Sequence, residues 1–115
     1  MRTKNMLIAC CCLLILVVPV CTSQDEEIRL NKERGNQIIQ AIDAYTQEHG
    51  QFPARLDDLV PVYIPEIPKT VGGEDFVYHV WYSEYYEVGF VLVSNRNRGC
   101  GYSSRYKDWE CGFGD

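Results

Sequence analysis

The chain of 115 residues is long enough for one small domain and too short for two. It carries 16 acidic and 11 basic residues, a net charge of −5 at pH 7, and this balance argues against nucleic acid as a partner. The aromatic residues, 12 % of the chain, all follow residue 21 and can supply a modest core.

Residues 1–21 have the pattern of an export signal. Arg2 and Lys4 precede an uncharged apolar run that ends at Cys21, and this run is shorter than the roughly 20 residues that a membrane-spanning helix needs. We assign residues 1–21 to a signal peptide, or in the alternative to an uncleaved membrane anchor, and residues 22–115 to the exported domain. The expected location is the periplasm or cell envelope, in association with the membrane.

Cys21 stands where the lipidated cysteine of a bacterial lipoprotein would stand, with polar residues directly after it. Val20 is larger than the small residue that usually precedes such a cysteine. Cleavage after Ser23 without lipidation is therefore the alternative. The cysteines at 10–12 lie inside the apolar run and are expected to act as small hydrophobic residues rather than as metal ligands.

The spacing of apolar residues predicts a helix from about Gln24 to His49, which Gly50 can end in the left-handed conformation. Its charged first half is expected to protrude into solvent as a stalk. The apolar residues of its second half fall on one side of a 3.6-residue helix: Ile38, Ile39, Ile42 and Tyr45.

A segment punctuated by prolines follows the helix. Residues 55–60 predict a second helix of about two turns, which a proline ends. Pro65 and Pro68 keep the next residues extended, so that Ile64 and Ile67 can anchor in the core.

The stretch AIDAYTQEHGQFPARLDDLVPVYIPEIP, about a third of the chain, resembles the segment after the long helix in type IV pilin-like proteins. It is most similar to the major pseudopilin of type II secretion. The resemblance implies a long helix packed on a small antiparallel sheet, in an envelope protein that contacts pilin-like subunits. The residues that carry it, in order, are Ala44-Tyr45, Gly50, Phe52-Pro53, Leu56, Leu59-Val60-Pro61, Tyr63, Ile64-Pro65 and Ile67-Pro68.

The leader departs from the pattern of that family. Pilins and pseudopilins carry a glycine cleavage site, then a hydrophobic start with a glutamate at its fifth position. The N-terminal residues here have neither feature. The resemblance is therefore to the globular part of a pseudopilin, carried on a different leader.

Two runs rich in aromatic and β-branched residues predict a hairpin with its turn near Ser83 and Glu84. The opposite face should carry His79, Trp81 and Tyr85. We expect the C-terminal tail to cover this face, and an exposed aromatic surface that binds a partner is the alternative. The residues predicted to face the helix are Phe76, Tyr78, Val80 and Tyr82 in the first run, and Tyr86, Val88, Phe90 and Leu92 in the second.

Cys100 and Cys111 stand in a glycine- and serine-rich tail that is expected to loop around one final short strand. In an exported domain such a pair predicts a disulfide. Many pilin-like proteins close this region with a bridge, so the resemblance implies the same pairing. A zinc site is the alternative, although the paired C-x-x-C or H-x-x-x-H spacing is missing. Trp109 is expected to be a packing residue.

No set of residues predicts a catalytic centre, a cofactor or a metal. The histidines, His49 and His79, have no plausible nucleophile nearby in the sequence. Asp57 and Asp58 suit the first turn of a helix. Three acidic residues of the tail lie where some pseudopilins bind calcium, without a convincing ligand spacing: Asp108, Glu110 and Asp115.

The sequence as a whole predicts an α+β fold of pilin-like type, with a long N-terminal helix, a short second helix and a small antiparallel sheet. The expected function is that of a non-catalytic envelope protein acting through protein contacts, as an accessory to a secretion or pilus system. A free-standing periplasmic or lipid-anchored binding module is the alternative, because a fold does not determine a function.

Overall fold

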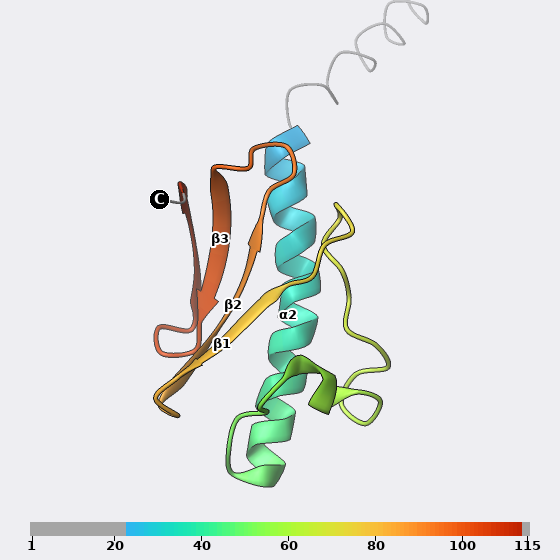
Figure 1. Ribbon diagram of the computed structural model, residues 1–115, viewed down its shortest axis with the longest axis vertical. Coiled ribbons are helices and arrows are strands. Elements are labelled where there is room, and N and C mark those ends of the chain that lie inside the picture. Colours follow the sequence, from blue (N-terminus) through green and yellow to red (C-terminus); the bar gives the residue numbers. More distant parts are fainter. Residues whose placement is uncertain (1–22, 114–115) are drawn as a thin grey trace, which may run out of the picture.

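The computed structural model describes residues 23–113, and the predicted signal peptide, Cys21 and Asp115 lie outside them. The helix α2 (Ser23–His49) packs on a four-stranded antiparallel sheet, so the fold is of the α+β class (Figure 1). A short 3₁₀ helix, η2 (Leu56–Leu59), follows α2. The strands are β1 (Val77–Trp81), β2 (Tyr85–Val91), β3 (Arg98–Ser103) and β4 (Asp108–Phe113). No helix within 23–113 is long and apolar enough to cross a membrane.

The end of α2 and the segment after it follow the predicted pattern closely. Gly50 has a φ of 76° and its N–H donates to the carbonyl of Thr46 at 2.8 Å, which closes the last turn. The second helix is one 3₁₀ turn of four residues rather than two α-turns. Asp58 caps it by accepting a hydrogen bond from the N–H of Arg55 at 3.1 Å. Ile64 is buried, as predicted.

The charged first half of α2 does not protrude as a solvated stalk, so that prediction is wrong. Glu27 is buried, and its carboxylate accepts hydrogen bonds from the N–H groups of Val93 at 2.7 Å and Ser94 at 3.2 Å. One turn later the buried Asn31 accepts a hydrogen bond from the N–H of Val71 at 2.8 Å. Each polar side chain exchanges water for a backbone donor, which offsets the cost of burial.

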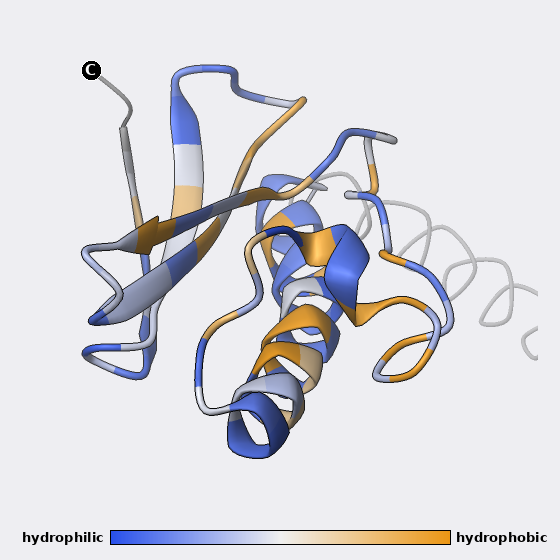
Figure 2. Cartoon of the chain, turned by 60° about the horizontal axis from the view of Figure 1, so that its bottom comes forward, coloured by the Kyte–Doolittle hydropathy of each residue, from blue (hydrophilic) through white to orange (hydrophobic). Residues whose placement is uncertain are grey.

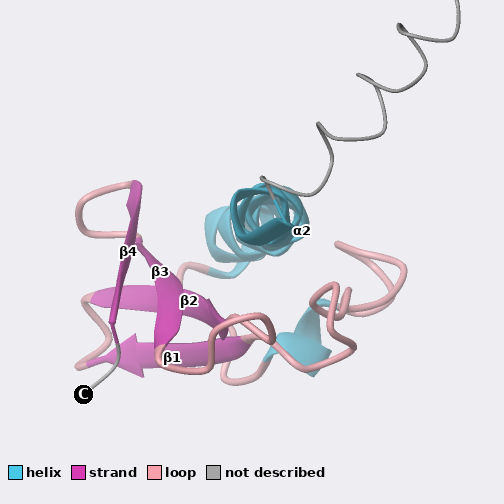
Figure 3. Ribbon diagram, turned by 90° about the horizontal axis from the view of Figure 1, so that it is seen from above, coloured by secondary structure: helices cyan, strands magenta, loops and turns pink. Residues whose placement is uncertain are grey.

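The four strands form a meander in the order β1-β2-β3-β4. The tail therefore contributes two strands, not one, and both extend the sheet beyond β2 instead of folding back over it (Figure 3). The segment from η2 to β1 lies beside the helix, away from β3 and β4 (Figures 1 and 3). The strands of the tail therefore do not provide the predicted cover of the sheet face turned away from the helix, and Arg105 from the turn between them reaches Tyr85 at its edge.

The predicted hairpin is present, with Trp81 opposite Tyr85 at its end. One residue is misplaced by the predicted alternation. Tyr82 does not face the helix but lies in the turn, with a φ of 51° and 86 % of its surface exposed. The turn breaks the two-residue period of the strand at this point, so the alternation ends at Trp81.

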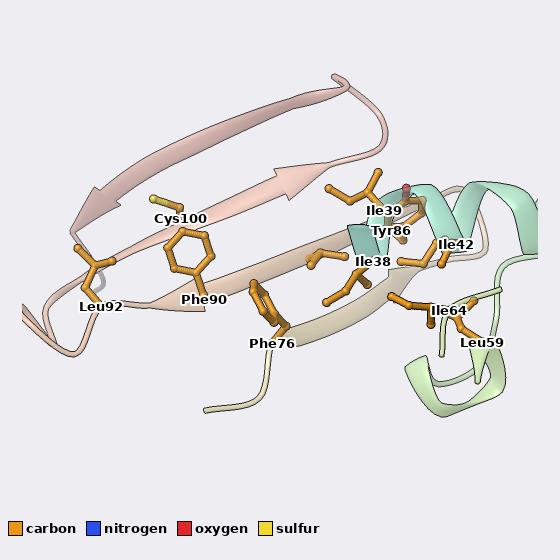
Figure 4. Close-up of a cluster of buried hydrophobic side chains, with 12 residues drawn as sticks. Ile38, Ile39, Ile42, Leu59, Ile64, Phe76, Tyr86, Phe90, Leu92 and Cys100 are labelled. Atoms are coloured by element: carbon orange, nitrogen blue, oxygen red, sulfur yellow. The ribbon is translucent and has the colours of Figure 1, made fainter. Parts of the chain in front are cut away.

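The core fills the space between α2 and the inner face of the sheet (Figure 4). Hydrophobic residues gather where α2, η2 and the following segment meet (Figure 2). Tyr86 is buried there and its hydroxyl donates to Asp43 Oδ1 at 2.8 Å. Burial, and then this hydrogen bond, raise the pKa of Tyr86 well above its ordinary value of 10.0. The hydroxyl therefore keeps its proton, and the hydrogen bond to Asp43, at pH values where an unperturbed tyrosine ionises.

Trp109 on β4 packs directly on the helix at Gly35. A Cβ added to Gly35 would lie 2.7 Å from the far edge of the indole ring. The ring nitrogen donates to Asn36 Oδ1 at 2.9 Å, and the rings of Phe90 and Tyr102 lie beside it with centroids at 5.7 Å. Trp109 is a packing residue, as predicted, and it needs a glycine on the helix.

A disulfide joins Cys100 to Cys111, as the sequence predicts, with the two Cα atoms 4.0 Å apart. The two cysteines are direct cross-strand partners on β3 and β4. The bridge faces the helix side of the sheet, next to the buried Phe90. It fastens the edge strand that carries Trp109 to the rest of the sheet.

We predict that Gly35→Ala destabilises the domain, although the same change in an exposed helix stabilises by about 1 kcal/mol. The added methyl group cannot fit under an indole ring that is held by its neighbours. Overpacking of this kind costs about 1–3 kcal/mol, so we expect a net loss on the order of 1 kcal/mol in urea unfolding.

Gln37→Ala, at an exposed position of the same helix, is the control and should change the free energy of unfolding by less than about 0.5 kcal/mol. In the double variant Gly35→Ala/Trp109→Phe the smaller ring should restore room for the methyl group. A gain in stability from Gly35→Ala alone would contradict the packing described here.

Candidate interaction surface

The side of the sheet turned away from α2, called the outer face below, is built from alternate residues of all four strands. The cross-strand pairs that share this face are Val77 with Gly89, His79 with Glu87, and Trp81 with Tyr85. Beyond β2 they continue through Gly101, Ser103, Asp108 and Glu110. Val77 is 61 % exposed and Trp81 36 %. The described chain leaves this face open to solvent.

The three residues that the sequence assigns to a partner surface lie together at one end of the outer face. Ring centroids of His79 and Trp81 are 4.2 Å apart, and those of Trp81 and Tyr85 are 6.4 Å apart in a stacked arrangement. Tyr82 from the turn joins them, 6.4 Å from Trp81. We call these four side chains the aromatic cluster. Contiguous exposed aromatic surface is characteristic of sites that bind a partner.

Arg105 from the turn between β3 and β4 reaches this cluster, which sequence reasoning missed. Its guanidinium carbon lies 4.6 Å from the centroid of the Tyr85 ring, and Nη2 lies 3.4 Å from Glu84 Oε2. An arginine held over an aromatic face and beside a carboxylate is a favourable cation–π arrangement. Arg105 lies 20 positions from Tyr85 and 21 from Glu84 in the chain, so no local pattern indicates these contacts.

A hollow of about 450 Å³ adjoins the outer face over β2, β3 and β4. We call it the acidic hollow, because three carboxylates line it. The two-residue alternation of β2 places Glu87 on the same face as Tyr85, so this carboxylate could be predicted from the sequence. The residues from β3 and β4 could not be predicted, because their position depends on how these strands pair. The lining residues are Glu87, Gly101, Tyr102, Ser103, Tyr106, Asp108 and Glu110.

The other residues considered in the sequence lie elsewhere. His49, at the end of α2, stacks on Tyr45 at 4.1 Å, and its Nε2 lies 3.0 Å from the hydroxyl of Tyr63. The Tyr63 hydroxyl donates to Glu48, which raises the pKa of Tyr63 to about 12. Both tail cysteines are bonded to each other and offer no thiol. Among residues 23–113 no three acidic, histidine or cysteine side chains are grouped to hold a metal ion.

A larger hollow, of about 640 Å³, lies between η2 and the start of β1. Its one lysine, Lys69, is already paired with Asp75, which lines the same hollow. Leu56, Val60 and Ile67 form most of its apolar wall. Its one aromatic residue, Phe76, is buried, so the outer face, where Trp81 and Tyr82 are exposed, is the stronger candidate for a partner surface.

Comparison of the chain with known proteins matched no family model, no curated protein and no solved structure.

We predict that replacing a tryptophan on the outer face costs less stability than replacing one on the inner face. Trp81→Ala should lower the free energy of unfolding by about 1 kcal/mol or less, because the side chain is partly exposed at the end of a hairpin. Trp109→Ala, the same change on the inner face, should cost about 3 kcal/mol or more. Equal losses in urea unfolding would mean that Trp81 serves the fold and not a partner.

Proposed function

We propose that this chain is a non-catalytic protein of the cell envelope that acts by binding another protein through the outer face of its sheet. The observation that carries the proposal is the aromatic cluster of His79, Trp81, Tyr82 and Tyr85, of which His79, Trp81 and Tyr82 stay exposed although the domain is small and rich in aromatic residues. Aromatic side chains of this kind supply much of the binding energy at protein interfaces.

The pilin-like interpretation belongs to this proposal. It is supported by the resemblance of residues 41–68 and by the order of a helix, an antiparallel sheet and a disulfide in the last strands. On this interpretation the protein is an accessory of a secretion or pilus system and contacts pilin-like subunits. The second candidate, a free-standing tethered binding module, is favoured by the leader, which lacks the pilin cleavage motif.

The proposal is tested by photocrosslinking in the native envelope. A benzophenone amino acid in place of Tyr85 of the full chain should crosslink to one protein partner, because Tyr85 lies within the aromatic cluster. The same probe in place of Val62, which is 79 % exposed in the segment after η2, is the matched control and should not. A pilin-like partner favours the accessory role, and a partner of another kind favours the binding module.

Crosslinks of equal yield at both positions, or none at Tyr85, would contradict the proposed interaction surface. A double variant, Trp81→Ala/Tyr82→Ala, gives an independent readout. It should abolish the Tyr85 crosslink without unfolding the domain, since both side chains project from the end of the hairpin.

The mode of attachment is a separate prediction. We expect the intact mass of the protein from its native membrane to show that the signal has been removed, because the apolar run is short for a membrane span. A chain beginning at Cys21 with added acyl groups would identify a lipoprotein, and Cys21→Ser should then abolish membrane association. A chain beginning at Gln24 without lipid would identify a soluble exported domain. The full-length mass would contradict cleavage.

A further inference from the structure

Four glycines occupy the middle of the outer face, and we call them the glycine floor. Gly89 is paired with Gly101 across β2 and β3, and Gly99 with Gly112 across β3 and β4. A Cβ on Gly101 or Gly112 would meet no atom within 4 Å, so the packing of the fold does not require a glycine at either position. Strand glycines commonly mark a site where another chain or a ligand comes close to the backbone.

The carboxylates around this floor lack a cation within the part of the chain that the structure describes. Glu87, Asp108 and Glu110 share the outer face, and the ion pairs formed by residues 23–113 all use other acidic residues. Three like charges around one hollow repel one another and create a local field that attracts a positive group. The hollow is therefore complementary to a cationic side chain brought by a partner.

The chain itself demonstrates how this face holds a cation. Arg105 lies between the ring of Tyr85 and the carboxylate of Glu84 at the edge of the same face. Trp81 stacks beside Tyr85 and offers a larger ring, 36 % exposed, for a second cation. The aromatic cluster and the acidic hollow thus share one preference, for lysine and arginine.

The spacing of the two parts matches an extended peptide. The pair of Trp81 and Tyr85 and the pair of His79 and Glu87 are two residues apart along their strands, which corresponds to about 7 Å. Side chains on one side of an extended peptide repeat at the same distance. When one basic side chain of the peptide lies over the aromatic cluster, the side chain two residues further along the peptide lies at the edge of the acidic hollow, beside Glu87.

We propose that the partner docks on the outer face with an extended, basic segment whose alternate residues are lysine or arginine. Its backbone lies over the glycine floor, one cationic side chain stacks on Trp81, and another enters the acidic hollow beside Glu87, Asp108 and Glu110. This inference rests on the proposed function, because it names the chemistry of the partner for that same surface.

The experiment uses the protein as purified from its native membrane in detergent, and a six-residue peptide of alternating threonine and lysine. We expect the peptide to shift the backbone amide resonances of β2, β3 and β4 in a saturable titration, and the matching threonine–glutamate peptide to shift none. The triple variant Glu87→Gln/Asp108→Asn/Glu110→Gln should raise the dissociation constant of the lysine peptide at least tenfold. Gly101→Val adds a branched side chain at a position where a Cβ would meet no atom within 4 Å, and it should also weaken binding of the lysine peptide.

The control variant removes the same number of negative charges from positions outside the outer face. Asp25, Asp57 and Glu66 are exposed and lie on α2, on η2 and in the segment after it, away from the outer face. The triple variant Asp25→Asn/Asp57→Asn/Glu66→Gln should change the affinity less than twofold. Equal weakening by the two triple variants would reduce the effect to net charge and overturn the proposal, as would binding of the glutamate peptide.

The Tyr85 crosslink separates this inference from the proposed function. If the crosslinked segment of the partner carries alternate basic residues and the crosslink disappears in the triple variant of the hollow, the inference stands. A crosslinked segment without basic residues, kept in that variant, overturns the inference and leaves the proposed function intact. Specific binding of the lysine peptide without any crosslinked protein in the envelope overturns the proposed function.

Discussion

The contact of Trp109 with Gly35 is the constraint on which the rest of the structure depends. A single helix must cover the inner face of four strands, and the indole ring carries β4 to the helix backbone, where any side chain at position 35 would hold it away. The disulfide between Cys100 and Cys111 keeps the strand that supplies this ring in register. Tyr102 and Trp109, the aromatic residues of β3 and β4 that pack on the core, are thereby committed to the inner face and do not cover the outer one.

Buried polar groups attach the loops to this frame. The carboxylate of Glu27 receives two backbone N–H groups from the β2–β3 connection, and Asn31 receives one from the segment before β1. These bonds hold both loops against a part of α2 that has few apolar side chains. The Nδ2 group of Asn31 has no partner among the described residues, which is a local cost of about 1–3 kcal/mol that the good acceptor bond of the same side chain must offset.

The parts of the fold that could be predicted are those with a short-range signal. The apolar period of α2, the glycine after it and the alternation in β1 and β2 each depend on residues within a few positions of one another. The role of Glu27 could not be predicted, because its partners lie 66 and 67 residues away and a charged residue on a helix usually faces water. Only one of the two tail strands was predicted, since Gly99, Gly101 and Gly112 lower the β-propensity of both β3 and β4.

The glycines of the outer face fall into two groups, those that the packing of the fold requires and those that it does not. Added Cβ atoms at Gly89 and Gly99 would lie 3.1 Å and 2.7 Å from backbone carbonyl oxygens, so the fold itself accounts for these two residues. Gly101 and Gly112 have free space above them and weaken their strands without any packing benefit within residues 23–113. A residue that reduces stability and satisfies no internal contact is best explained by a contact outside the chain, and the carboxylates beside Gly101 indicate the charge of what makes it.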